Sequence, residues 1–246
     1  MRDVPLTYHP LERLPVPRPV DRYRHVRQRC TGLRVLDLGA YDETEVNRSQ
    51  HPSWRWLHAE IAAVAREVLG VDASSKVKAA GSITTRCGTR IVYGTVETLD
   101  DVLRDFKPQM IVAGELIEHT QDTLGWLSRL ASAAPGARLL ATTPNATSII
   151  NLLLAFLSRE NSHPDHLHVY SFKTLSTLAA RVPMREIGIC PYFYDPHLFL
   201  GRVPRRAAPL VVGVDRAFFR PIQWLFPLTS FGLIEPVDAG IDRGDV

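Results

Sequence analysis

The feature that most constrains the fold is a regular alternation of short apolar runs with helix-like segments between residues 34 and 144. The five apolar runs are RVLDLG, LGVDAS, RIVYGT, QMIVAGEL and ARLLATTP, which begin at residues 34, 69, 90, 109 and 137. Each run is short and rich in aliphatic residues, as buried strands are. Such alternation predicts parallel strands joined by right-handed helical crossovers. We therefore predict an α/β fold whose ligand binds beyond the carboxyl ends of the strands.

The segments around and after these runs are less regular. Residues 54–68 carry apolar side chains at helical spacing, which predicts a helix. Residues 146–159 and 171–182 also predict helices, the second with Ser171 as its N-cap. Two further strands are predicted within 185–194 and 232–238. Between them lies an aromatic segment, residues 215–231, that prolines interrupt.

The N-terminal residues differ in composition from the rest of the chain. Residues 1–20 contain five prolines, which fix φ and remove amide donors, so this stretch is predicted to be an extended arm. Residues 21–30, DRYRHVRQRC, predict a short basic helix. We assign residues 1–32 to this arm and helix, and residues 33–246 to one domain. Within that domain, residues 146–231 are expected to supply the acceptor side and a lid.

Composition excludes several classes of protein. A net charge of +3 over 246 residues is small for a dedicated nucleic-acid binder. The three cysteines are far apart and form no CxxC pair, which disfavours a disulfide framework and a cysteine zinc site. The N-terminus lacks the apolar core of a signal peptide, and the most apolar stretch, residues 149–157, is too short to span a bilayer. We expect a cytoplasmic protein without a transmembrane segment.

Two acidic residues follow or end predicted strands. Asp37 precedes Gly39 at the end of the first strand, where a glycine allows a tight turn against a ligand. Asp72 ends the second strand, where a carboxylate can accept hydrogen bonds from both ribose hydroxyls of a nucleoside or cap a helix. The dinucleotide pattern GxGxxG is absent, so the sequence gives little support for an NAD enzyme.

The ordered series VLDLGAYDE, VLGVDAS, IVYGTVETL, QMIVAGELIEHT and LLATTPN resembles the motifs of class I S-adenosylmethionine-dependent methyltransferases, over roughly residues 33–180. The resemblance implies a Rossmann-like, seven-stranded mixed sheet, mostly parallel, with a reversed C-terminal hairpin and helices on both faces. It also implies S-adenosylmethionine as the cofactor and a biosynthetic methyltransferase as the activity. This chain departs from the family in its first loop, Gly-Ala-Tyr-Asp-Glu, which has fewer glycines than usual.

The resemblance assigns cofactor contacts by position. Residues near the methionine part of the donor are Asp37, Gly39 and Ala40. Asp72 binds the ribose. The residues bordering the adenine are Thr95, Val96 and Glu97, with Thr95 standing where many members have an aspartate. Gly114 and Glu115 line the cleft between cofactor and acceptor.

The stretch from Glu115 to His119 offers a candidate metal site. Glu115, Glu118 and His119 follow the fourth strand, and His166 lies further along in the sequence HPDHLH. Two acids and two imidazoles can hold Mg²⁺, Mn²⁺ or Zn²⁺, which would lower the pKa of an acceptor hydroxyl. This combination partly resembles small-RNA 2′-O-methyltransferases and ubiquinone-pathway O-methyltransferases. The alternative is a metal-free helix start with solvated acids.

Without a metal, His119 is the first candidate for the general base and His166 the second, because the pKa of a histidine lies near neutrality. The remaining alternatives concern the acceptor. The first is a small molecule: a sugar, a glycosylated metabolite or a lipid-linked intermediate. The second is metal-dependent methylation of an RNA 2′-hydroxyl, which the small net charge disfavours. The third is a non-catalytic member of the fold that binds a partner.

Overall fold

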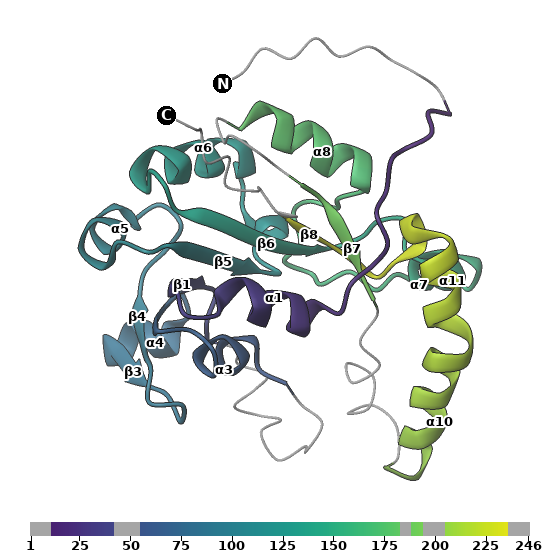
Figure 1. Cartoon of the computed structure of the whole chain (residues 1–246), viewed down its shortest axis with the longest axis horizontal. Coiled ribbons are helices and arrows are strands. Elements are labelled where there is room, and N and C mark those ends of the chain that lie inside the picture. The colour runs from purple at the N-terminus through teal and green to yellow at the C-terminus, as the bar shows by residue number, and fades with distance from the viewer. Residues whose placement is uncertain (1–10, 42–54, 183–187, 194–204, 236–246) are drawn as a thin grey trace, which may run out of the picture.

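The strands of this computed structural model form one sheet in the order β3-β4-β2-β1-β5-β6-β8-β7 (Figure 1). The structure describes residues 11–41, 55–182, 188–193 and 205–235. The strands are β1 (Arg34–Leu38), β2 (Glu67–Asp72), β3 (Ser82–Thr84), β4 (Arg90–Tyr93), β5 (Met110–Gly114), β6 (Arg138–Pro144), β7 (Cys190–Tyr192) and β8 (Gly232–Glu235).

The predicted α/β architecture is confirmed. Strands β4, β2, β1, β5 and β6 are parallel neighbours. Strand β8 runs antiparallel to both β6 and β7, which makes the reversed C-terminal hairpin. The described sheet has eight strands where seven were expected, because a short hairpin adds β3 antiparallel to β4. Its turn closes through the amide of Thr85, which donates to the Thr89 carbonyl at 2.8 Å, and Gly88 supplies a φ of +76°.

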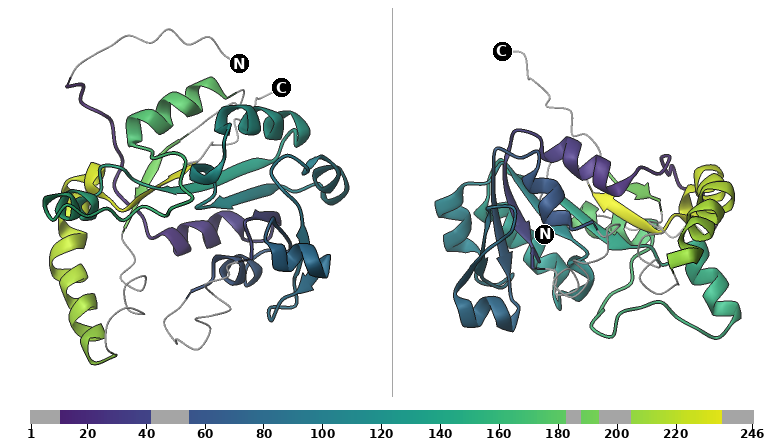
Figure 2. Two further views of the ribbon diagram at one scale, coloured as in Figure 1. Left: turned by 180° about the vertical axis from the view of Figure 1, so that it is seen from behind. Right: turned by 90° about the horizontal axis from the view of Figure 1, so that it is seen from below.

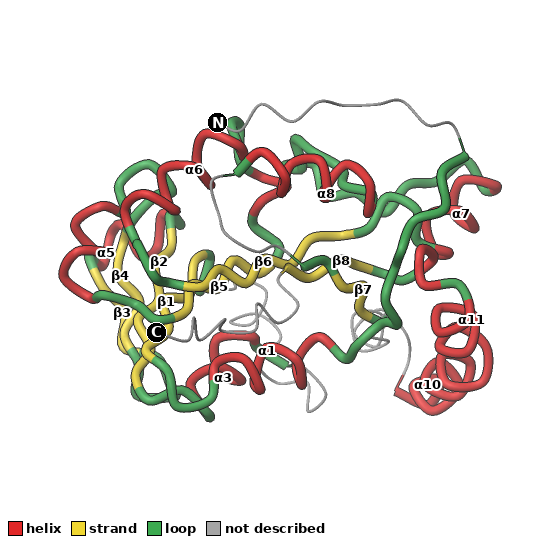
Figure 3. The backbone as a smooth tube through the Cα atoms, turned by 45° about the horizontal axis from the view of Figure 1, so that its top comes forward, coloured by secondary structure: helices red, strands yellow, loops and turns green. Residues whose placement is uncertain are grey.

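Helices cover both faces of the sheet (Figures 1 and 3). They are α1 (Arg22–Cys30), α3 (Leu57–Ala62), α4 (Ser75–Ala80), α5 (Asp100–Phe106), α6 (Thr123–Ala133), α7 (Ile149–Phe156), α8 (Phe172–Arg181), α10 (Ala208–Val214) and α11 (Arg220–Leu225). Short helical turns are η1 (Ile117–His119), η2 (Arg205–Ala207), η3 (Asp215–Phe219) and η4 (Pro227–Thr229).

The core has one layer on each side of the sheet. Leu127 of α6 packs in the same buried cluster as Ile111 of β5, on the face that α5, α6 and α8 cover. The next residue of β5, Val112, points to the other face and packs with Val26 of α1. Alternation along the strand therefore explains why β5 is apolar throughout.

The helix predicted over residues 54–68 is shorter in the structure. Helix α3 ends at Ala62, and β2 already begins at Glu67, which pairs with Arg34 of β1. Val68 therefore lies in a strand, where its β-branched side chain is favoured. The capped helix predicted from Ser171 is confirmed: its hydroxyl accepts from the Thr174 amide in a capping box.

The aromatic segment is more helical than its prolines suggested. Segments α10, η3 and α11 follow one another without a break from residue 208 to residue 225. A π-helical turn at η3 joins them, and the Arg220 amide donates to the Asp215 carbonyl across it. Pro221 directly follows this π-helical turn, at the beginning of α11. None of the helices in the described ranges is long and apolar enough to cross a membrane.

Candidate active site

The predicted cofactor residues lie at the carboxyl ends of parallel strands. Asp37 is next to last in β1, Asp72 is last in β2, and Gly114 is last in β5. Because β2, β1 and β5 are parallel neighbours, these residues lie along one edge of the sheet. This is the edge at which open α/β sheets bind their ligands.

The Asp37 carboxylate is buried and held by a histidine. His58 of α3 lies with its Nδ1 2.8 Å from Oδ2 of Asp37 and its Nε2 2.8 Å from the Thr89 hydroxyl. Both Asp37 and His58 are buried. Sequence reasoning did not find His58, since no spacing in the chain links it to a residue 21 positions earlier. His58, which Thr89 holds in turn, therefore fixes the Asp37 carboxylate at the start of the first loop.

Replacing His58 with alanine is expected to destabilise the protein by about 3 kcal/mol, because it leaves a buried carboxylate without its partner. Urea unfolding followed by circular dichroism measures this change. His163→Ala is the control, since that side chain is exposed. Equal stability of the two variants would show that the contact to Asp37 contributes little.

The first loop turns back onto β2. Gly39 has a φ of +71°, a conformation that glycine adopts without steric cost. The amides of Gly39 and Ala40 both donate to the Val71 carbonyl, at 2.9 and 3.3 Å. The indole of Trp56 donates to the Ala40 carbonyl at 3.0 Å. The remainder of the loop, residues 42–54, lies outside the described residues.

Asp72 already accepts two main-chain hydrogen bonds. The amides of Tyr41 and Ser74 donate to its two carboxylate oxygens, each at 2.8 Å. Burial raises the pKa of Asp72, an effect that these amides oppose. Each oxygen keeps a second lone pair, so the carboxylate can still accept from two hydroxyls.

The predicted adenine residues form a turn directly after β4. The Gly94 amide donates to the Asp72 carbonyl at 3.1 Å, which places this turn beside the end of β2. The Thr95 amide donates to the Thr98 hydroxyl at 3.0 Å. Val96 is half-buried and Glu97 is exposed, with the Glu97 carbonyl accepting from Arg129. The three predicted adenine residues therefore lie in a hydrogen-bonded turn beside Asp72.

Glu115 lies in a network that the sequence did not predict. Its Oε1 accepts from the hydroxyls of Tyr192, at 2.7 Å, and Thr142, at 3.0 Å. The Arg22 guanidinium lies 3.6 Å from the same oxygen. Glu115 has a φ of +54°, which is uncommon for a residue with a side chain. Burial, reinforced by the charge of Glu115, raises the pKa of Tyr192 well above its ordinary value, so the phenol stays a donor.

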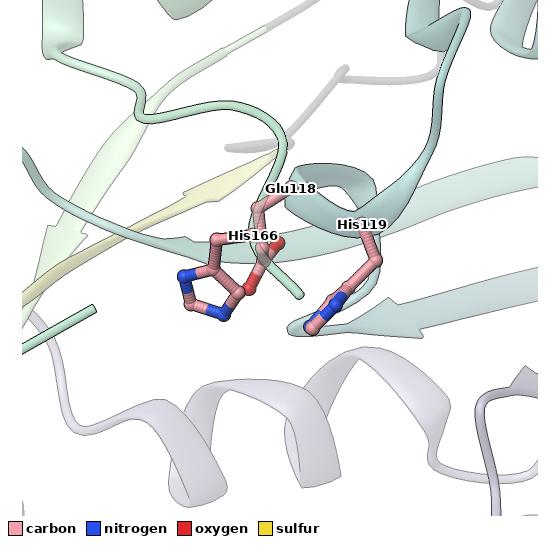
Figure 4. Close-up of side chains that lie close together, drawn as sticks. All are labelled: Glu118, His119 and His166. Atoms are coloured by element: carbon pink, nitrogen blue, oxygen red, sulfur yellow. The ribbon is translucent and has the colours of Figure 1, made fainter. Parts of the chain in front are cut away.

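Three of the four predicted metal ligands come together (Figure 4). One ligand atom from each of Glu118, His119 and His166 lies within 4.8 Å of the others. Glu118 and His119 come from η1, and His166 comes from the loop between α7 and α8. That loop is anchored to η1, because the amides of Leu167 and His168 donate to the Glu118 carbonyl at 2.8 and 3.1 Å. Glu115 points to Arg22 and Tyr192.

The Glu118 carboxylate is almost fully buried, with 1% of its surface exposed. Among the described residues, neither of its oxygens accepts a hydrogen bond of ordinary geometry, although the Thr143 hydroxyl lies near enough to lower its pKa. Burial and then the charge of Glu115 raise the pKa of Glu118 to about 8. An unsatisfied buried carboxylate beside two imidazoles is an arrangement that a cation would stabilise.

The histidines around Glu118 form a wider group than the predicted pair. The rings of His119 and His166 lie 4.6 Å apart, and His163 lies 5.9 and 5.7 Å from them. Burial and the neighbouring His119 lower the pKa of His166, which favours the neutral imidazole that binds metals. His168 instead packs against Tyr170, with ring centroids 6.0 Å apart.

In metal-free protein, Glu118→Gln is expected to raise the free energy of unfolding by about 1–3 kcal/mol near pH 8. The folded state holds the Glu118 proton more tightly than the unfolded chain does. The stabilisation of the folded state by this bound proton is therefore complete below the ordinary pKa of 4.5. It is lost as the pH rises to about 8. Thermal unfolding in EDTA from pH 5 to 8.5 should show the variant gaining on the wild type. A constant difference across this range would contradict it.

A family model described as a methyltransferase domain matches residues 13–182, more than half of the chain. The chain belongs to this methyltransferase family. It is therefore an enzyme, and the methyl donor of the family is S-adenosylmethionine. The resemblance seen in the strand-end motifs is confirmed at this level.

One solved structure with a TM-score above 0.5 supports the same fold. The methyltransferase is similar to small RNA methyltransferase HEN1 (13% identity, TM-score 0.52), with 87% of this chain and 24% of that chain covered. It is also similar to an S-adenosylmethionine-dependent methyltransferase from Archaeoglobus fulgidus (13% identity, TM-score 0.45), covering 87% and 93%. A third is a putative methyltransferase from an antibiotic biosynthesis pathway of Anabaena variabilis (13% identity, TM-score 0.49), covering 91% and 98%. No curated protein matches the chain.

Proposed function

We propose that this methyltransferase methylates a hydroxyl oxygen of a small-molecule acceptor, with a divalent cation held by Glu118, His119 and His166. The observation that carries the proposal is that ligand atoms of these three residues lie within 4.8 Å of one another, one of them on a buried carboxylate. A cation bound there would lower the pKa of an acceptor hydroxyl and leave coordination positions for acceptor oxygens. Two imidazoles and one carboxylate suit Mn²⁺ or Zn²⁺ better than Mg²⁺.

The donor is proposed to lie along the strand ends. Asp72 accepts from the ribose hydroxyls through its remaining lone pairs. The adenine lies against the turn of Thr95, Val96 and Glu97, and the methionine part lies near Asp37, Gly39 and Ala40. Gly114 and Glu115 then separate the donor from the acceptor. Tyr192 and Arg22 hold the Glu115 carboxylate in place between the two, so Glu115 is proposed to position donor and acceptor relative to each other.

Methyl transfer requires alignment more than activation of the donor, whose sulfonium already carries a positive charge. The bond from sulfur to the methyl carbon breaks as the bond from the acceptor oxygen to that carbon forms, which leaves a neutral thioether. The acceptor proton goes to a base. When His119 and His166 hold the cation, that proton passes to solvent water. In a site without a cation, His119 is the proposed base, since its partly exposed ring lies beside His166.

A chelation experiment tests the metal proposal. The enzyme is incubated with labelled S-adenosylmethionine and fractionated extract, with and without EDTA, and label is followed into small polar molecules, lipid and RNA. We expect label in the small-molecule or lipid fractions, loss with EDTA, and recovery with Mn²⁺ or Zn²⁺. Full transfer in EDTA would eliminate the cation and leave His119 as the base. In that case the substitution His119→Ala would abolish methyl transfer.

The second candidate acceptor is an RNA 2′-hydroxyl. The same group of Glu118, His119 and His166 favours it, since the stretch from Glu115 to His119 resembles small-RNA methyltransferases. The net charge of +3 disfavours it, because phosphate contacts supply much of the affinity for RNA. A gel shift with short RNA separates the candidates: binding that weakens steeply with salt would move the assignment to RNA.

A further inference from the structure

Large apolar side chains are exposed mainly in one part of this methyltransferase. Within the described residues, all such side chains except Leu11 and Tyr93 lie between residues 152 and 228. Helices α7 and α10 contain no buried residue at all. The exposed set on and around α7, α10, η3 and α11 comprises Leu152, Leu153, Phe156, Leu157, Leu210, Val214, Phe218, Trp224, Leu225, Phe226 and Leu228. We call this set the apolar end.

The segment from α10 to α11 is amphipathic. Leu210, Val214 and Phe218 follow one another at four-residue spacing and are all exposed, so they share one side of the helix. Asp215 and Gln223 are buried on the protein side. Two polar residues therefore face the protein while large apolar residues face outward, although an ordinary surface helix in a soluble domain turns its apolar side inward.

Helix α7 and the segment from α10 to α11 lie at the end of the sheet away from β3, with α7 beside α11 (Figures 2 and 3). Hydrogen bonds join them at their base. The Thr147 hydroxyl, just before α7, donates to the Leu228 carbonyl at 2.7 Å. The Asn145 amide donates to the carbonyls of Leu228 and Ser230, each at 2.8 Å. These hydrogen bonds tie the residues just before α7 to those just after α11.

The charge of this surface is one-sided. Between residues 206 and 233 the sequence has three arginines, Arg206, Arg216 and Arg220, and one acidic residue, Asp215. Asp215 is buried, and its carboxylate lies 2.8 Å from Nε of Arg220. Arg206 and Arg216 are exposed. Exposed charge on this helical segment is therefore positive.

We propose that the apolar end binds the surface of a lipid bilayer that contains anionic headgroups. Exposed Leu, Phe and Trp side chains on a helix with arginines are the pattern of interfacial helices, which lie in the plane of the membrane. Arginines complement anionic headgroups. A second copy of the same surface fits less well, because a symmetric contact would bring the arginines of both copies together.

Docking would bring the active site to the bilayer. The loop that carries His163 and His166 begins where α7 ends, and it also exposes Leu167 and Val169. An amphiphilic acceptor could then reach the Glu118 cluster from the membrane, a consequence that rests on the proposed function. Vesicle binding itself requires no turnover, so its failure and the failure of the catalytic proposal are distinguishable.

Vesicle flotation tests the proposal on the full chain. The vesicles are phosphatidylcholine alone or with about 30% phosphatidylglycerol, at low salt. We expect wild type to float with the anionic vesicles and at least tenfold less with neutral ones. The double variant Phe156→Asp/Leu210→Asp should lose at least tenfold, since both side chains are highly exposed. The control Leu11→Asp makes the same chemical change at an exposed site elsewhere and should bind as wild type does.

A charge variant and a mass measurement complete the test. Arg206→Gln/Arg216→Gln should reduce flotation with anionic vesicles and leave the thermal unfolding temperature unchanged. Circular dichroism checks that the apolar variants fold. Wild type that stays with the soluble fraction, or an apolar double variant that floats equally well, would overturn the proposal. So would a dimer in sedimentation that the double variant converts to a monomer without any vesicle binding.

Discussion

Replacing Asp72 with asparagine is expected to weaken the binding of S-adenosylmethionine at least tenfold, or about 1.4 kcal/mol or more. The carboxylate accepts from the amides of Tyr41 and Ser74, which leaves one lone pair on each oxygen for a ribose hydroxyl. An asparagine amide nitrogen donates instead of accepting. One of those contacts is therefore lost, and one backbone amide faces another donor.

Isothermal titration calorimetry with S-adenosylmethionine measures this effect. Asp105→Asn is the control, because it makes the same change at an exposed position on α5. Thermal unfolding without ligand separates donor affinity from the loss of the contacts to the first loop. Unchanged affinity in a folded Asp72→Asn protein would remove the ribose role from this residue.

His166→Ala is expected to abolish the thermal stabilisation that Mn²⁺ gives the wild-type protein. A ligand at 100 times its dissociation constant stabilises by about 2.7 kcal/mol, which a thermal shift assay detects easily. Losing His166 removes one of the three ligands that lie within 4.8 Å of one another. His119→Ala should act in the same way.

His163→Ala is the matched control for these variants. It removes an imidazole from the same loop, 5.7 Å from the ring of His166, yet outside the group of three ligand atoms. It should keep the response to Mn²⁺. A response retained in His166→Ala and lost in His163→Ala would assign the cation to different ligands.

Much of the fold was predictable because local patterns determine it. The five central strands are short apolar runs separated by helical segments, and each lies where the pattern placed it. The missed strand β3 has three residues and leaves no periodicity to read. The overlong helix prediction failed at Val68, whose apolar side chain continues the helical spacing although its β-branched shape favours a strand. Pairing with β1, not local propensity, decides the outcome there.

The candidate site was predictable only where its residues are close in the sequence or share a strand end. Glu118 and His119 are adjacent, and the family resemblance added His166. Sequence spacing gives no indication that Tyr192 donates to Glu115, because the two residues are 77 positions apart. His58 beneath Asp37 is hidden for the same reason. Such contacts depend on how helices and the final hairpin dock on the sheet.

The strand order also has a consequence for synthesis of the chain. Tyr192 lies in β7, whose sheet partner is β8, and β8 alone joins it to β6. As the ribosome delivers residues from the N-terminus, β7 emerges about 40 residues before the strand that places it. Val20, which is made much earlier, already bridges to Tyr192 from the other edge of β7, and β8 then joins this pair to the sheet. The donor-binding residues and the group of Glu118, His119 and His166 all precede β7, so a chain shortened before β8 would keep them and lack the strand that joins Tyr192 to the sheet.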